Sequence, residues 1–476
     1  MKSVAAVLIP FLLLLSPAPP AAAETLQLPS IPTYVRAIGR SLVLVGADGF
    51  VRVIAEGRIV ASIGPLPDLV GVDAADVTGD GSDDLVLVLK HGVGVADLSS
   101  GEVRGVRYAD LETLHSRFDI VNSPRSARLF MARDGNGKAY PAWFGEEGLY
   151  VHKDGHTRLI SKEAPRALLN LVTTQVAMPG EDTVSVGFPR PVAFDIDADG
   201  VAEVAYLHGG TVKIVHTDRS EVGEIDVGGY TSDFPGILWE PAAFRFATRA
   251  DGTVVLVVLS LQLDASRLTS ANLLASFFAV PADLGGRRIS PVPLKRQVVG
   301  EIPLSNGSCS FDDFGGGRPG VVVRMVDIVG SMTDLMVHRS VTFLFQAYRL
   351  DVQALAFAKV AGQIRFAMSV DGLLGDRDRT ASVPSLVAST DFAEMLGSTF
   401  LRCRDEAGTG VVAVTNLQAR EVLVYEADGA RLLRRLAVPR EVRLTDKTSL
   451  IATAQGFELY SLRGRALSRF VLKGQR

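Results

Sequence analysis

Asp195-Ile-Asp197-Ala-Asp199-Gly200-Val201-Ala-Glu203-Val204 carries acidic residues at positions one, three, five and nine, with a glycine at position six. An apolar strand follows directly. Asp76-Val-Thr78-Gly-Asp80-Gly81-Ser82-Asp-Asp84-Leu85 repeats this spacing and also runs into an apolar strand. Calcium takes about six to eight oxygen ligands, and a loop supplies them from alternate residues around a glycine at the sharp turn. Both stretches are therefore predicted to be calcium loops that lie between β-strands.

The predicted ligands are side-chain oxygens, with one backbone carbonyl at position seven of each loop. The complete set is Asp76, Thr78, Asp80, Ser82, Asp84, Asp195, Asp197, Asp199, Val201 and Glu203. The alternative interpretation of each loop is an Asp-Gly turn whose carboxylate caps the backbone. Two copies with one spacing favour calcium, because clustered carboxylates repel one another without a cation. We expect two Ca²⁺ ions with a structural role, since an ion saturated by oxygen ligands leaves little room for a substrate.

Weaker copies of the loop mark a repeat along the chain. They are centred on Gly137, Gly252, Gly317, Gly372 and Gly408, mostly at intervals of roughly 60 residues. Short apolar strands separated by Gly, Asp and Asn turns fill the intervals. Several strands per interval, repeated about seven times, predict an all-β fold, a single β-propeller of seven four-stranded blades. Two packed β-sandwich domains are the alternative; they explain the strand density but not the regular loop positions.

The two ends of the chain resemble each other. The stretch from Ser41 to Val53 and the stretch from Ser449 to Tyr460 each contain a strand, a Gly-Phe pair and a second strand. Propellers commonly close by pairing their two ends in one blade, which removes exposed sheet edges. We therefore expect the N- and C-terminal segments of this chain to pair.

Residues 1–23 have the form of a signal peptide, and residues 24–476 form the propeller. The first segment has a charged start, an apolar run and a small-residue end, so cleavage is expected after Ala23. A membrane anchor is the alternative, but the run is about a dozen residues where ~20 are needed to span a bilayer. The mature chain is therefore expected to have no transmembrane segment and to be exported, to the periplasm or the extracellular space.

Composition and cysteine content narrow the class of protein. Lys and Arg total 49 against 53 for Asp and Glu, so the chain lacks the basic excess of a nucleic-acid-binding protein. Its two cysteines, Cys309 and Cys403, either pair or lie buried as small side chains. A fold held together by many disulfides is excluded.

The loop pattern, recurring at blade-length intervals after a signal peptide, resembles that of exported bacterial-type members of the FG-GAP or VCBS repeat family, which is related to the integrin α-subunit propeller. The resemblance is specific at the two complete loops. It implies a seven-bladed propeller, calcium in the loops of certain blades, and commonly a role in binding or scaffolding. The loop at Asp312 departs from the pattern, because Phe314, Gly316 and Gly320 replace carboxylates, so we expect no metal there.

The functional expectation is an exported, calcium-stapled binding or scaffold module, principally for protein partners, with a glycan as the other class of ligand. No linear catalytic motif is present in the sequence, so we do not expect an enzyme. The alternative is a propeller enzyme that acts on carbohydrate at a channel mouth, and a further alternative is a subunit of an envelope assembly. Candidate residues for those other sites are His152 and His156 for zinc and Trp143, Trp239 and Asp233 for a glycan.

Overall fold

The computed structural model describes the chain from residue 24 to residue 472 with internal gaps. The described ranges are 24–38, 40–67, 69–75, 84–89, 92–96, 129–133, 139–144, 149–153, 156–162, 168–169, 186–187, 192–208, 210–217, 222–228, 237–264, 270–303, 307–313, 319–326, 340–369, 400–404, 410–416, 420–426, 431–443, 446–453 and 456–472. All regular elements in these ranges are β-strands, which confirms the all-β class. They contain no helix of the length and hydropathy that a membrane crossing requires.

Most strands pair with their neighbours in sequence as antiparallel meanders. In the first half of the chain the sheets are β2 (Pro32–Ile38), β3 (Ser41–Gly46), β4 (Val51–Ala55), β5 (Arg58–Ile63); β6 (Leu69–Ala75), β7 (Asp84–Leu89), β8 (Gly92–Ala96); β9 (Leu129–Arg133), β10 (Ala139–Phe144), β11 (Leu149–Lys153), β12 (His156–Ser161); and β15 (Val192–Phe194), β16 (Glu203–His208), β17 (Thr211–Val215), β18 (Val222–Asp226) with β22 (Arg288–Ile289). A separate two-stranded sheet consists of β13 (Leu168–Leu169) and β14 (Val186–Gly187).

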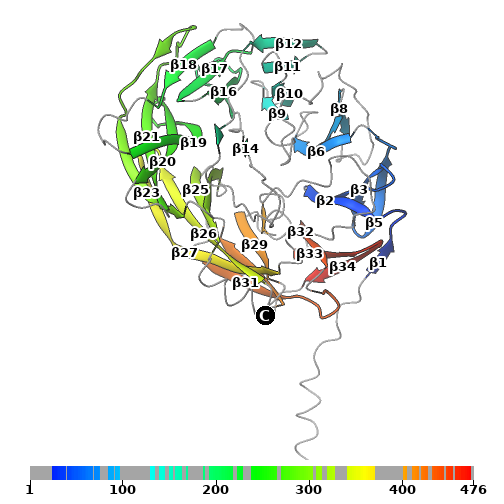
Figure 1. The fold of residues 1–476 in the computed structure, drawn as a ribbon. Helices are drawn as coiled ribbons and strands as arrows, with labels where there is room; N and C mark the ends of the chain where they lie inside the picture. The colour runs from blue at the N-terminus through cyan, green and yellow to red at the C-terminus, as the bar shows by residue number, and fades with distance from the viewer. Residues whose placement is uncertain are drawn as a thin grey trace, which may run out of the picture.

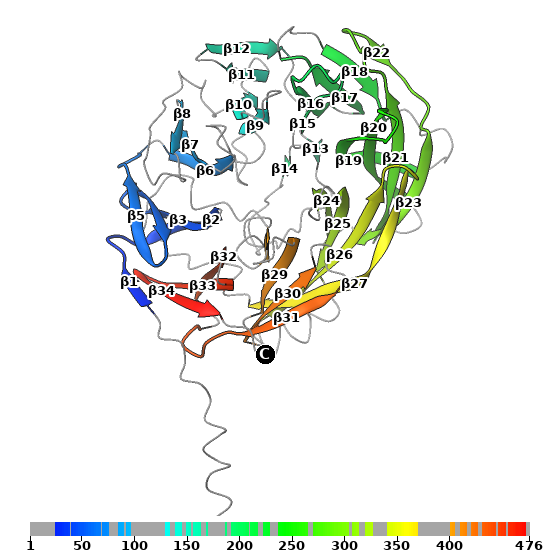
Figure 2. The same ribbon diagram turned by 180° about the vertical axis from the view of Figure 1, so that it is seen from behind.

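The second half continues the same pattern. Its sheets are β19 (Ile237–Thr248), β20 (Val254–Asp264), β21 (Ser270–Val280), β23 (Lys295–Pro303); β24 (Gly307–Asp313), β25 (Pro319–Val326), β26 (Ser340–Asp351), β27 (Ala356–Ser369); β28 (Phe400–Arg404), β29 (Gly410–Asn416), β30 (Glu421–Glu426), β31 (Leu432–Ala437); and β32 (Lys447–Thr453), β33 (Gly456–Arg463), β34 (Ala466–Leu472) with β1 (Glu24–Gln27). Figures 1 and 2 show these sheets following one another around a common centre.

The number of sheets differs from the expected seven four-stranded blades. The described ranges contain eight sheets of three or more strands, one with three strands and one with five. The loop markers predict too few sheets because the connections β2–β3 and β32–β33 lack the acidic pattern. The markers at Gly81, Gly137, Gly200, Gly252, Gly317 and Gly408 all lie between the first and second strands of a sheet, and Gly372 lies outside the described residues.

The hydrophobic core consists of clusters between neighbouring sheets. One cluster joins the β15–β18 sheet to the β19–β23 sheet and contains Ile225, Phe246 and Phe278. Another joins the β9–β12 sheet to the β15–β18 sheet through Val151 and Tyr206. Apolar side chains on both faces of a strand are therefore buried, as in β16, whose burial is almost continuous.

The connection between β21 and β23 crosses to the neighbouring sheet and reinforces it. Its short strand β22 pairs in parallel with β18, the outer strand of the β16 sheet. Leu284 of this connection is 2% exposed and packs into the cluster between the two sheets. Asp226 accepts hydrogen bonds from Arg288 at 2.8 Å and from Ser290 at 2.7 Å. The sheet that carries the second acidic loop is thus stabilised by this connection at its outer strand as well as by packing against its neighbouring sheets.

The two ends of the chain meet in one sheet, as expected. β1 pairs antiparallel with β34, with Glu24 opposite Arg469. Arg469 donates to Glu458 Oε2 and to Glu24 Oε2, both at 2.9 Å. Glu458 is 6% exposed and also accepts from the Tyr460 hydroxyl. One guanidinium therefore neutralises a buried carboxylate and links it to the N-terminal strand.

We predict that Arg469→Met lowers the free energy of unfolding by about 3–5 kcal/mol, because it leaves the buried Glu458 carboxylate without its cation. Chemical denaturation of the purified protein measures this. Glu24→Gln is the matched control: it alters the exposed end of the same network and should change stability by no more than about 1 kcal/mol. Equal effects of the two substitutions would contradict the role assigned to Glu458.

Candidate metal centre

The second acidic loop connects β15 to β16 in the reinforced sheet. Its second residue, Ile196, is 4% exposed and belongs to the core cluster shared with the β19–β23 sheet. Its last residue, Glu203, is the first residue of β16 and is 2% exposed. Both ends of the loop are thus fixed by packing, while Asp199 at its centre is exposed.

Hydrogen bonds within the loop shape its turn. The backbone amide of Gly200 donates to Asp195 Oδ2 at 3.1 Å, that of Asp199 to Asp197 Oδ1 at 3.2 Å, and that of Val201 to Asp199 Oδ1 at 2.8 Å. Gly200 has a φ of +88°, a left-handed conformation that favours glycine. The carboxylates therefore gather on the inside of the turn by capping the backbone.

Asp195, Asp197 and Asp199 form one group that is able to hold a cation. One carboxylate oxygen from each lies within 4.8 Å of the others. The Oδ1 atom of Asp195 is buried and accepts no hydrogen bond from the residues that the structure describes. A buried carboxylate oxygen without a partner is costly, and three carboxylates this close repel one another. The turn hydrogen bonds alone leave this oxygen unsatisfied, whereas a cation would satisfy it.

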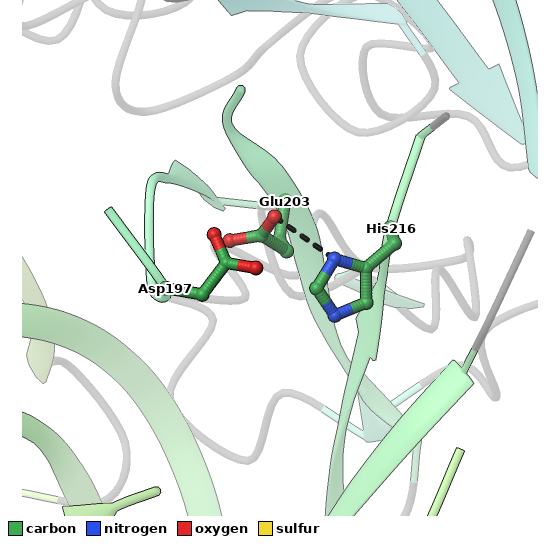
Figure 3. Close-up of side chains that lie close together, drawn as sticks. All are labelled: Asp197, Glu203 and His216. Carbon is green, nitrogen blue, oxygen red and sulfur yellow. Dashed lines mark ion pairs between the residues drawn. The ribbon is translucent and has the colours of Figure 1, made fainter. Parts of the chain in front are cut away.

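Glu203 belongs to a second group, with Asp197 and His216. Its Oε2 accepts from the backbone amide of Ile196 at 2.7 Å, and its Oε1 lies 3.1 Å from His216 Nδ1. Figure 3 shows the Asp197 carboxylate beside this pair. One ligand atom from each of the three residues lies within 4.8 Å of the other two. The structure thus divides the four acidic residues of the loop between two overlapping groups that share Asp197.

The pKa of Glu203 is displaced by this environment. This pKa is raised from 4.5 to about 7, chiefly because burial penalises the charged form; the Ile196 amide opposes this rise, and the Asp197 and Asp199 carboxylates add to it. A cation in the loop would favour the ionised form and oppose this displacement.

The first acidic loop is only partly described. Asp76, Thr78, Asp80 and Ser82 lie outside the described residues. Asp84 is the first residue of β7 and is 1% exposed, which is the place that Glu203 occupies in β16. Val201 lies in the second loop as expected, half-buried.

Other acidic markers and candidate residues have simpler explanations or lie outside the description. Asp251-Gly252 is a hairpin turn between β19 and β20, in which Asp251 caps the Thr253 amide at 3.0 Å. The capping interpretation holds there. Cys309 is half-buried. The side chains of the remaining candidates are not described: His152, His156, Trp143, Trp239, Asp233 and Cys403.

Sequence reasoning missed His216, although a signal for it exists. Val204 pairs with Val215 across the β16–β17 hairpin. The residue before the first and the residue after the second are Glu203 and His216, which therefore lie opposite each other at the same end of the hairpin. Counting outward from the predicted Gly209-Gly210 turn would have brought them together.

Comparisons with known proteins do not identify the chain. No protein-family model matches it, and no curated protein does. Solved structures that resemble it include BBS1N in complex with ARL6DN, with a TM-score of 0.37 and 12% identity over 85% of this chain and 92% of that one. A lectin from Agrocybe aegerita that recognises non-reducing terminal N-acetylglucosamine has a TM-score of 0.36 and 15% identity over 87% and 89%.

A third similar structure is the GH93 α-L-arabinofuranosidase of Fusarium graminearum with arabinobiose, with a TM-score of 0.32 and 10% identity over 74% of this chain and 95% of that one. Similarity at this level supports no argument about the fold or function of this chain.

We predict that the metal-free protein loses stability as the pH rises from about 5 to about 7. Glu203 has a higher pKa when folded than when unfolded, so the folded state binds more protons in this window and its stabilisation is lost as the proton leaves. Denaturant midpoints measured across this range should fall with pH. Glu203→Gln should remove much of that slope, and an identical slope in the variant would contradict the displaced pKa.

Proposed function

We propose that this chain is an exported β-propeller that acts as a binding or scaffold module for protein partners, and that Ca²⁺ bound in its acidic loops has a structural role. The propeller interpretation is supported by three features. Most of the sheets are successive meanders, six of the loop markers lie between the first and second strands of a sheet, and the chain ends pair in one sheet. On this basis each of the eight larger sheets is a blade.

The observation that carries the calcium proposal is the buried Asp195 Oδ1 atom, which has no hydrogen-bond partner in the described part of the chain. It belongs to a group of three carboxylates that face one another across a tight turn. Hard oxygen donors of this kind suit Ca²⁺. Asp195, Asp197 and Asp199 would hold the ion, with the Val201 carbonyl as a further ligand. The first loop is proposed to hold a second ion through Asp76, Thr78, Asp80, Ser82 and Asp84.

The chemistry that calcium supplies in this arrangement is a cross-link. It would tie together residues along the connection between β15 and β16, and so restrict a loop that otherwise carries several negative charges. A rigid frame with fixed inter-strand loops is suited to presenting a surface to a partner, since less conformational freedom is lost on binding. The role of the metal is therefore support of a binding surface rather than activation of a substrate.

We predict that removal of calcium with a chelator lowers the melting temperature of the mature protein. Each site contributes about 2.7 kcal/mol to stability when free Ca²⁺ is about 100 times the Kd. Asp197→Ala should remove most of the contribution of the second loop, and Asp195→Asn should weaken it without changing the shape of the side chain. Differential scanning calorimetry with and without Ca²⁺ measures both effects.

The matched control is Asp251→Asn, in an Asp-Gly turn that belongs to neither described carboxylate group. Its response to calcium should equal that of the wild type. Melting curves of the wild type that coincide with and without chelator would rule out the calcium proposal.

The binding role is tested with calcium-loaded mature protein immobilised and exposed to envelope extract. We expect a protein to be retained, and the same protein, once purified, to bind with a measurable Kd that weakens when calcium is removed. Turnover of polysaccharide substrates without any retained protein would contradict the binding role and favour the carbohydrate-active alternative.

A further inference from the structure

His216 adds a nitrogen donor to a loop whose other donors are oxygens. It is 8% exposed, and its Nδ1 atom faces the Oε1 atom of Glu203, which is 2% exposed. Asp197 completes a group whose ligand atoms lie within 4.8 Å of one another. This group comes from three different places in the sheet: the turn, the start of β16 and the residue after β17.

The donor set differs from that of a calcium loop. Calcium takes oxygen ligands, whereas imidazole is a ligand for zinc and other first-row transition metals. Two carboxylates and one imidazole, with a further position for water, match the three-protein-ligand zinc sites of proteins. Two ligands bound to one tetrahedral zinc at about 2.0–2.1 Å stand roughly 3.3 Å apart, and the Nδ1 and Oε1 atoms are 3.1 Å apart.

An ion pair between His216 and Glu203 does not by itself account for the arrangement. Asp197 brings a second carboxylate to the same point, so the group offers two carboxylates and one imidazole. The neighbouring Asp195 Oδ1 atom, buried without a hydrogen-bond partner among the described residues, also favours a cation at this turn. Figure 3 shows Asp197, the residue common to both groups, beside Glu203 and His216.

We propose that Asp197, Glu203 and His216 form a second cation position, selective for a borderline divalent metal such as Zn²⁺, beside the calcium ligands of the same loop. The proposal rests on the proposed metal role of this loop, because Asp197 is common to both groups. Glu203 then serves the zinc position, held by the Ile196 amide through its other oxygen, while Asp195 and Asp199 serve calcium. The two positions would differ in their response to substitution.

The test titrates Zn²⁺ into mature protein in millimolar Ca²⁺, with isothermal calorimetry as the readout. The wild type should bind Zn²⁺ at this position, and His216→Gln should weaken that binding at least about tenfold, the lower end of the effect of losing even an outer ligand. Glutamine keeps a donor for Glu203, so the variant should fold. His208→Gln removes a histidine from the other strand of the same hairpin and should bind Zn²⁺ like the wild type.

A spectroscopic readout keeps the proposal testable if the variant fails to fold. Mn²⁺ bound to the wild type in place of zinc should give the nitrogen hyperfine coupling of one imidazole in pulsed electron paramagnetic resonance. Absence of this coupling, or equal Zn²⁺ affinity of His216→Gln and the wild type, would overturn the second position.

Failure of this inference and failure of the calcium proposal are distinguishable. Asp195→Asn should reduce the calcium-dependent rise in melting temperature and leave Zn²⁺ affinity close to that of the wild type, whereas His216→Gln should do the reverse. A calcium response without zinc binding overturns only the second position. Zinc binding without a calcium response overturns the calcium proposal.

Discussion

A single antiparallel sheet of this protein cannot cover its own two apolar faces, and this constraint organises the molecule. β16 is buried along nearly its whole length because the β9–β12 sheet lies on one side and the β19–β23 sheet on the other. Hydrophobic burial stabilises a protein by roughly 25 cal/mol per Å² of apolar surface removed from water, so each sheet needs two neighbours. The β2–β5 sheet and the sheet that contains both chain ends are neighbours of this kind. They pack against each other through the cluster that contains Leu42 and Tyr460.

Pairing of β1 with β34 follows from the same requirement. The hydrogen bonds of the two strands close the sheet that holds both ends of the chain, and Arg469 joins them electrostatically through the buried Glu458. The crossing connection that adds β22 to β18 serves a similar purpose at an outer edge, since it covers a strand that would otherwise expose unpaired backbone groups.

The acidic loop exploits the rigidity of this frame. Packing fixes Ile196 and Glu203 at its two ends, so the carboxylates between them are held close despite their repulsion. The hairpin register then brings His216 to Glu203 from the adjacent strand. The sequence of the loop predicts only oxygen ligands, whereas the structure forms two overlapping groups of possible metal ligands. One group has oxygen atoms alone, and the other also includes the imidazole of His216.

The all-β class, the position of the loops between strands and the pairing of the chain ends were predictable from local pattern, because strand periodicity and turn chemistry depend on neighbouring residues. The number of sheets was not, since the sequence between β2 and β3 (Gly39-Arg40) and between β32 and β33 (Ala454-Gln455) contains no acidic marker. Asp195, Asp197 and Asp199 were recognisable from spacing alone, and the structure brings them together. Only tertiary structure decided that Glu203 turns to His216 and that Asp195 Oδ1 is left buried without a hydrogen bond, because strand register and inter-sheet packing bring together atoms that the spacing of one loop does not relate.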